Sequence, residues 1–453
     1  MKKLIFLTLA IMLSVIGCAK QQEAPQQPQE NPQPQQSAQA TAETPKAQTW
    51  HFAVRTETQK NEYKADDGTV VAARSYEQPL LTLVNEDGET FTGSTPEQGV
   101  TAEQLAACEA FNDATASTGL WEVDLEEQGR EIYALRAENN EEMPPVGEEV
   151  TVSEVYQNGD LLSVLAADYI YLGGAHPDNG LQSWIFDLAK GEFVSLWSLT
   201  DRPDELKQTL IYAIGAQISA SEEADGFFEN WYETLSQKDD FNVFFHAEGM
   251  TVWFQAYDLG PYALGIPQFE IPYGTISRFL NAYGEQLLDL PAEARVIGDF
   301  HEAQELWSWL DSGAPVDDSD KQNAEIGGVT YELYRLNSPG VNTISDLSDK
   351  LSRYVDKAFV DAQLAKTDQF RELDGKLYVY IAGRGDDLTI ASVDYEAQMG
   401  ADGKGGKVIA TIHRQDYDDA TGAWKLTGAV DTHEFPFTLY DGHAVFDRME
   451  YLY

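Results

Sequence analysis

Seven histidines and two cysteines are the residues of this 453-residue chain whose types are most often used in catalysis or metal binding. The histidines are scattered, and the closest pair, His433 and His443, is ten residues apart. A zinc helix needs two histidines four residues apart, but the stretch that begins at His301 has Glu305 in the second position. The chain also has no nucleophile elbow and no glycine-rich phosphate loop. We therefore expect no enzyme activity, no cofactor and no metal, although a metal site assembled from distant residues stays open.

The cysteine that points to chemistry is Cys18, because of what precedes it. Two lysines and an apolar run occupy residues 2–16, and Gly17 directly precedes Cys18. A charged start, an apolar run and a small residue at the cleavage point are typical of a secretion signal. Residues 14–18 resemble a bacterial lipobox, which implies removal of residues 1–17 and lipidation of Cys18. The alternative is a transmembrane anchor with an incidental cysteine, but a span needs about 20 apolar residues.

The segment that follows the lipobox has the composition of a tether. Residues 18–48 consist mainly of Gln, Pro, Ala, Glu, Ser and Thr. Such a segment cannot build an apolar face, so we expect it to be disordered. Its prolines favour an extended form that reaches on the order of 90 Å at ~3.1 Å per residue. The sequence therefore predicts an extracytoplasmic location in the cell envelope, with a lipid anchor in the membrane.

The charge of the chain restricts its partners. Lysine and arginine number 30, aspartate and glutamate number 76, and the formal net charge is −46. A surface this acidic repels nucleic acid and anionic lipid headgroups, and it attracts cationic proteins. An adaptation for solubility or for a salty habitat would give the same composition, so the charge alone leaves both interpretations open.

Beyond residue 48 the pattern of apolar residues predicts an α+β fold with mostly antiparallel sheets and packed helices. We expect two or three domains, at residues 49–165, 166–295 and 300–453. The first should contain strands around one helix, and the stretch 313–327 should be a loop. The expected helices cover residues 101–117, 201–219, 275–290, 301–310 and 343–364. Capping boxes at Thr101 and Thr343 predict the starts of two of them, and Asn158-Gly159 predicts a hairpin turn.

One cluster of small and cyclic residues stands out as a candidate binding site. Gly173 and Gly174 follow an apolar strand, and His176 and Pro177 come two residues later. Paired glycines let the backbone pass where a side chain would clash, and the proline ring stiffens the corner. His176 could contact a ligand, or its imidazole could simply hold the corner by hydrogen bonds. Both roles stay open from the sequence.

A second motif lies further along the chain and, with the first, carries a family resemblance. Residues 257–265 read Tyr-Asp-Leu-Gly-Pro-Tyr-Ala-Leu-Gly, and a strand and a closing helix follow. The two motifs, in this order, resemble the extracytoplasmic domain of RsiV-type anti-sigma factors, which also precedes the catalytic domain of PdaC-type peptidoglycan deacetylases. We find no such catalytic domain in this sequence, so the resemblance implies the binding module alone. In RsiV-type proteins this module senses lysozyme by binding it.

Residues 300–453 show a fainter resemblance, to IseA-type inhibitors of cell-wall endopeptidases. It is carried by short motifs around Trp307, by the Gly-Gly-Val-Thr-Tyr stretch at 327–331, and by Asp-Gly-Lys-Leu-Tyr at 374–378. Together with the lipobox and the acidic charge, these resemblances imply a surface lipoprotein that binds a cationic wall hydrolase such as lysozyme and inhibits or senses it. The alternative is a non-catalytic envelope protein that binds peptidoglycan or another glycan.

Overall fold

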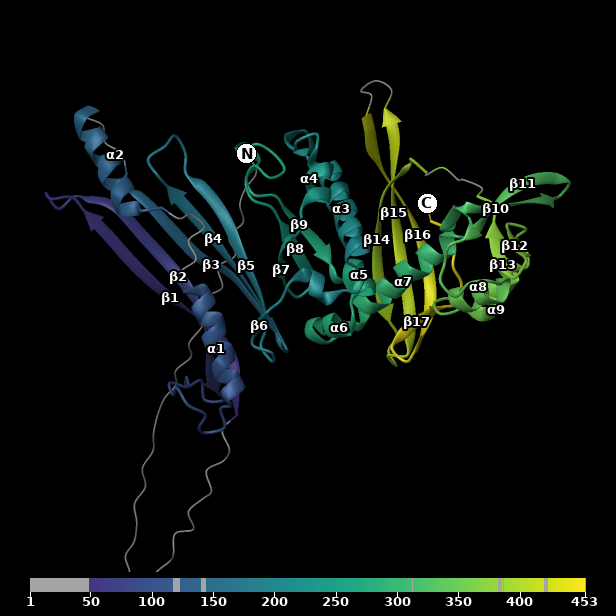
Figure 1. Cartoon of the computed structure of the whole chain (residues 1–453), viewed down its shortest axis with the longest axis horizontal. Coiled ribbons are helices and arrows are strands. Elements are labelled where there is room, and N and C mark those ends of the chain that lie inside the picture. Colours follow the sequence, from purple (N-terminus) through teal and green to yellow (C-terminus); the bar gives the residue numbers. More distant parts are fainter. Residues whose placement is uncertain are drawn as a thin grey trace, which may run out of the picture. The chain divides into compact units, whose positions relative to one another are not determined.

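The computed structural model describes residues 49–116, 123–139, 144–311, 313–381, 385, 387–418 and 423–452 (Figure 1). Within these residues the chain forms an α+β fold with four sheets, as the sequence predicts, and all strand pairs except β2–β3 are antiparallel. The described residues belong to one compact unit. None of their helices is long and apolar enough to cross a membrane. Cys18, the signal at 1–17 and the tether at 18–48 lie outside the described residues.

The first sheet has six strands in sequential order. Its strands are β1 (Trp50–Lys64), β2 (Val70–Asn85), β3 (Val146–Asn158), β4 (Leu161–Tyr171), β5 (Asp178–Asp187) and β6 (Glu192–Phe193). Two helices, α1 (Ala102–Thr115) and α2 (Leu125–Asn139), connect β2 to its parallel neighbour β3. The Thr101 capping box starts α1, and the hairpin turn at Gly159 joins β3 to β4, so both local predictions are confirmed. The second helix, α2, was not expected.

Strand β4 is buried on both faces, and it joins this sheet to the next part of the chain. Leu162 and Val164 pack with Phe111 of α1, whereas Leu161 belongs to the core of the following sheet. Successive side chains of a strand point to opposite faces, which explains why a run of apolar residues is needed here. A hydrogen bond of 2.9 Å from the backbone amide of Phe245 to Oγ of Ser163 adds a polar link.

The second sheet is small and is covered by helices (Figure 1). Its strands are β7 (Asn242–Phe245), β8 (Gly249–Trp253) and β9 (Gln268–Pro272). The α-helices of this part are α3 (Pro203–Ala220), α4 (Trp231–Gln237), α5 (Tyr273–Ile276) and α6 (Ala282–Leu288). Short 3₁₀ helices are η1 (Leu196–Leu199), η2 (Ala224–Gly226), η3 (Tyr262–Leu264) and η4 (Ser277–Phe279). The apolar stripe predicted for α3 is confirmed, since all five of its residues from Leu206 to Ile218 are buried.

Two further sheets share one core around helix α7 (Ala292–Ser308). One sheet, in the order β10-β11-β13-β12, consists of β10 (Val316–Ile326), β11 (Val329–Leu336), β12 (Phe370–Leu373) and β13 (Lys376–Val379). The other, in sequential order, consists of β14 (Ile390–Met399), β15 (Gly405–Asp418), β16 (Ala423–Tyr440) and β17 (His443–Phe446). Helices α8 (Ile344–Leu351) and α9 (Lys357–Leu364) complete this part.

Two of the predicted helices are interrupted. The helix expected at 275–290 is divided into α5, η4 and α6, because the Asn281 side chain accepts a hydrogen bond from the backbone of Gly284 and starts α6 anew. The helix expected at 343–364 begins at the predicted Thr343 capping box but ends at Leu351. Asp356 then caps α9, and its backbone amide bonds to strand β17. In both cases a side-chain cap and a tertiary bond override the helical pattern.

Most of the stretch 313–327, expected to be a loop, forms strand β10, because β11 supplies its backbone partner. The expected domain boundaries at 165 and 295–300 fall inside β4 and α7, and both elements continue across them. The division into three domains therefore stays a prediction.

Cys108 is free and half-buried in helix α1. Burial still raises the pKa of this thiol to about 11, so the reactive thiolate is suppressed at neutral pH.

Candidate binding site

The Gly-Gly-Ala-His-Pro corner lies between the end of β4 and the start of β5. Gly173 adopts a positive φ of 83°, and a Cβ there would lie 3.0 Å from the side chain of Ile132 in α2. Gly174 has no such constraint, since its nearest neighbour would be the carbonyl oxygen of His176 at 3.8 Å. The His176 side chain is exposed, and its Nδ1 lies 3.0 Å from the carbonyl oxygen of Pro177. Of the two glycines, only Gly173 is required by the backbone.

The second motif forms a tight loop between β8 and β9. Tyr257 has a positive φ of 71° and an exposed side chain, and Gly260 lies where a Cβ would clash with Leu264. The Gln255 side chain fastens the start of this loop to β5. Its amide nitrogen donates to the carbonyl of Leu181 at 3.0 Å, and its oxygen accepts from the amide of Leu181 at 3.3 Å.

The two motifs meet in space. The rings of His176 and Tyr262 are stacked, with centroids 4.1 Å apart and planes 28° apart. The Tyr262 hydroxyl donates a hydrogen bond of 2.5 Å to the carbonyl of Pro177, across 85 residues of sequence. The ring of Tyr257 lies 5.9 Å from that of Tyr262. We call His176, Tyr257 and Tyr262 the aromatic cluster. His176 thus helps to hold the corner against the second motif, whereas its contact with a ligand stays a prediction.

The aromatic cluster offers ring faces rather than reactive groups. Tyr257 is 55% exposed, which is high for a large aromatic side chain held in a constrained backbone conformation. The carboxylate of Asp178 is exposed two residues after His176, whereas Asp258 is engaged by Lys238 at 3.1 Å. Aromatic faces carry negative potential and bind cationic side chains or flat apolar surfaces. This surface is therefore chemically suited to a cationic or ring-bearing partner.

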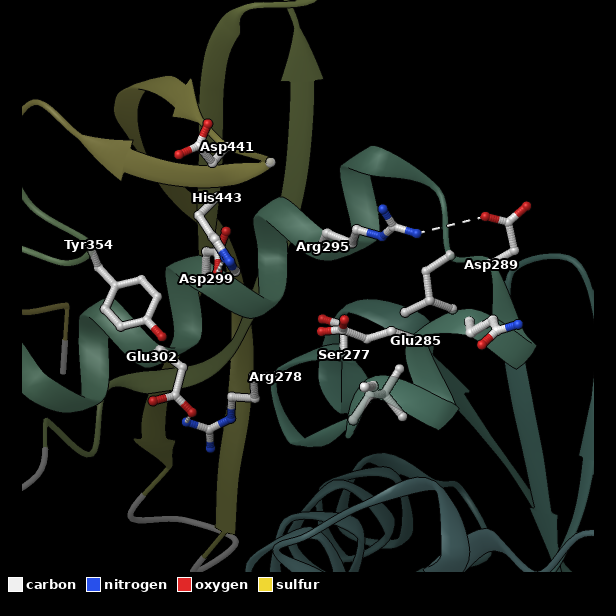
Figure 2. Close-up of a pocket in the computed structure, with 15 residues that line it drawn as sticks. Ser277, Arg278, Glu285, Asp289, Arg295, Asp299, Glu302, Tyr354, Asp441 and His443 are labelled. Carbon is white, nitrogen blue, oxygen red and sulfur yellow. Dashed lines mark ion pairs between the residues drawn. The ribbon is translucent and has the colours of Figure 1, made fainter.

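A separate charged cavity of about 650 Å³ lies between the η4–α6 segment, helix α7 and the β16–β17 turn (Figure 2). Figure 2 shows Arg295, Asp299 and Glu302 along one side of α7, with His443 facing Asp299. No local pattern in the sequence predicts this grouping, because its residues come from three separate segments, at 277–302, 354 and 441–443.

Several of the charged side chains of this cavity are paired with one another or with neighbouring residues. Arg278 lies 2.5 Å from Glu305 and 3.8 Å from Glu302, which also accepts a 2.6 Å hydrogen bond from Arg202. Asp299 accepts the backbone amide of Ala444 at 2.7 Å and lies 3.5 Å from Nδ1 of His443. Arg295 and Asp289 are 3.7 Å apart. These pairs link α7 to η4, α3 and β17, which gives them a structural role.

Burial raises the pKa of Asp299 above its usual value of 3.8, although the Ala444 amide and His443 act in the opposite direction. Over the part of the chain that the structure describes, no group of three His, Cys, Asp or Glu side chains is placed to hold a metal ion.

The comparisons with known proteins give a family for one segment. Residues 200–274 match the model of DUF3298, described as a protein family of unknown function. This segment lies within the 166–295 stretch and contains Tyr257 and Tyr262, whereas His176 precedes it. No curated protein matches the chain.

Two solved structures are similar to this chain. A DUF3298 family member from Bacteroides fragilis is 14% identical, with a TM-score of 0.35 over 53% of this chain and 97% of that one. A DUF3298 family protein from Pseudomonas aeruginosa is 14% identical, with a TM-score of 0.33 over 51% of this chain and 95% of that one. By the family model alone, residues 200–274 of this chain are similar to the DUF3298 family.

The two glycines of the corner should respond differently to the same substitution. Gly173→Ala places a side chain at positive φ and against Ile132, so it should lower the free energy of unfolding by about 1–2 kcal/mol or more. Gly174→Ala, the matched control, should leave stability unchanged or raise it by up to about 1 kcal/mol. Chemical denaturation of both variants measures this difference. Equal losses would contradict the assigned geometry.

Asp299 should affect stability in a pH-dependent manner. The pKa of the Asp299 carboxyl is higher in the folded state than its unfolded-state value of 3.8. The carboxyl therefore stabilises the native state fully at pH values below 3.8, and this stabilisation is lost as the pH rises through the folded-state pKa. Asp299→Asn keeps an acceptor for Ala444, so it should be at least as stable as wild type at pH 7, and any gain should vanish at acid pH. Asp299→Ala leaves the amide unpaired and should cost about 1–3 kcal/mol. Thermal unfolding at several pH values provides the measurement, and an equal loss in both variants would refute the assignment.

Proposed function

We propose that this chain is a surface lipoprotein that binds a cationic cell-wall hydrolase such as lysozyme, and thereby inhibits or senses it. The observation that carries the proposal is the aromatic cluster, whose His176 and Tyr257 rings are exposed on a chain of net charge −46. Binding rather than catalysis suits these residues, because the cluster presents ring faces held in place by hydrogen bonds.

Charge and aromatic rings contribute to binding in different ways. The excess of carboxylates speeds the encounter with a cationic protein and sets its orientation. Tyrosine and histidine rings then accept lysine or arginine side chains, each contact contributing about 0.5–2 kcal/mol depending on how dry it is. Tyrosine is also among the residues that most often carry the binding energy of interfaces.

The remaining parts of the proposal rest on the sequence. Lipidation of Cys18 would hold the chain on a membrane, and residues 18–48 would carry the folded part away from the surface. The RsiV-type resemblance around the two motifs and the IseA-type resemblance of residues 300–453 both favour a hydrolase as the partner.

A second candidate is a non-catalytic module that binds peptidoglycan or another glycan. The observation that favours it is the exposed ring of Tyr257 beside the stacked His176 and Tyr262, because a sugar ring can lie on an exposed aromatic face. The two candidates differ in salt dependence, because an uncharged glycan gains little from the acidic surface.

Titration of the full chain, in mild detergent, with lysozyme tests the leading candidate. We expect binding at low ionic strength that weakens as salt is added. Tyr257→Ala should weaken it roughly tenfold, the effect of losing an interface contact of about 1.4 kcal/mol. Tyr440→Ala removes another exposed tyrosine, 61% accessible at the end of β16, and should have no effect.

An absence of lysozyme binding at low salt would overturn this proposal for that hydrolase. Binding to purified wall sacculi that is insensitive to salt and is lost in Tyr257→Ala would favour the glycan candidate instead.

A further inference from the structure

A second cavity, of about 730 Å³, runs along strand β14. Five consecutive residues of this strand, Val393 to Ala397, line it. Successive side chains of a strand point to opposite faces, so one cavity can touch five in a row only where it follows the edge of the strand. The cavity is therefore a groove beside the edge of β14, and we refer to it as the edge groove.

The edge of β14 is open to a further strand. Among the described residues, β14 has a strand neighbour on one side only, namely β15. The opposite edge of the same sheet, β17, is closed by another segment. The Phe446 amide donates to the carbonyl of Tyr354, and the Asp356 amide donates to the carbonyl of Phe446, both at 2.8 Å. Exposed edges offer backbone groups for pairing with another chain.

The floor of the edge groove is apolar and uncharged. Its lining includes Ile297 and His301 of α7, Tyr395 of β14 and Tyr273 of α5. The His301 ring packs edge-on against Tyr395, with centroids 4.9 Å apart. Burial and the nearby Arg278 lower the pKa of His301 to about 4, so the imidazole is neutral at pH 7. The floor can therefore take an apolar side chain.

The rim of the edge groove is acidic. Its carboxylates are Glu248, Glu293, Asp394 and Glu396, whereas its one arginine, Arg278, is already paired with Glu305. Asp394 lies 2.8 Å from His413, and the other three belong to exposed positions. An acidic rim favours a basic occupant and disfavours a second copy of this chain, whose own β14 would bring like charges together.

We propose that the edge groove binds an extended peptide segment of another protein, with alternating apolar and basic side chains, by adding it as a strand to β14. Backbone hydrogen bonds to β14 supply the affinity, and the apolar floor and acidic rim select the side chains. This site is separate from the aromatic cluster, so the peptide-binding proposal does not depend on the hydrolase proposal.

An acetylated and amidated octapeptide of alternating valine and lysine is a suitable probe. Added to the full chain in detergent, it should slow amide hydrogen exchange of residues 390–399. The same peptide with an N-methyl group on every residue has no amide donor on either edge and should bind at least roughly tenfold more weakly. A valine–glutamate octapeptide should not bind.

Two charge-reversal variants distinguish specific binding at the edge groove from non-specific attraction of the peptide to an acidic protein. Glu396→Lys should weaken binding of the valine–lysine peptide severalfold, whereas Glu62→Lys, the same change on edge strand β1, should leave it unchanged. Tyr257→Ala should also have no effect, which distinguishes this site from the aromatic cluster. Protection outside β14, equal binding of the N-methylated peptide, or equal losses in both reversals would overturn the proposal.

Discussion

The candidate binding surface depends on the attachment of the 255–265 loop to the start of β5. Gln255 pairs through both amide atoms with the backbone of Leu181, and the Tyr262 hydroxyl bonds to the carbonyl of Pro177. These contacts fix two loops that are far apart in sequence. If they were lost, His176 would no longer lie against Tyr262, and the rings would become separate exposed side chains without a common surface.

The cores on either side of β4 hold these two loops in register. Leu162 and Val164 face α1, whereas Leu161 and Leu165 face the small sheet, so the first half of the strand that leads to the Gly173 corner is fixed from both sides. Strand β8, which leads to the second loop, is buried throughout. Rigid strands thus end in short loops that carry exposed rings, an arrangement that lowers the entropy cost of binding.

Local signals in the sequence were sufficient for part of this architecture. The capping boxes at Thr101 and Thr343, the apolar stripe of α3 and the turn at Gly159 involve residues within a few positions of one another, and the structure confirms each. Strand β10 needed a partner strand, and the break before Asp356 needed a bond to β17, so neither is visible in a local pattern. The meeting of His176 and Tyr262 is of this second kind. The sequence marked both motifs but contained no signal that they touch.

Hydrogen-exchange footprinting of the full chain with and without lysozyme, at low salt, tests the central claim most directly. The account predicts slower exchange at residues 173–178 and 255–265, with the remainder of the six-stranded sheet unaffected. A bound complex that leaves both segments unprotected would show that the aromatic cluster does not form the interface.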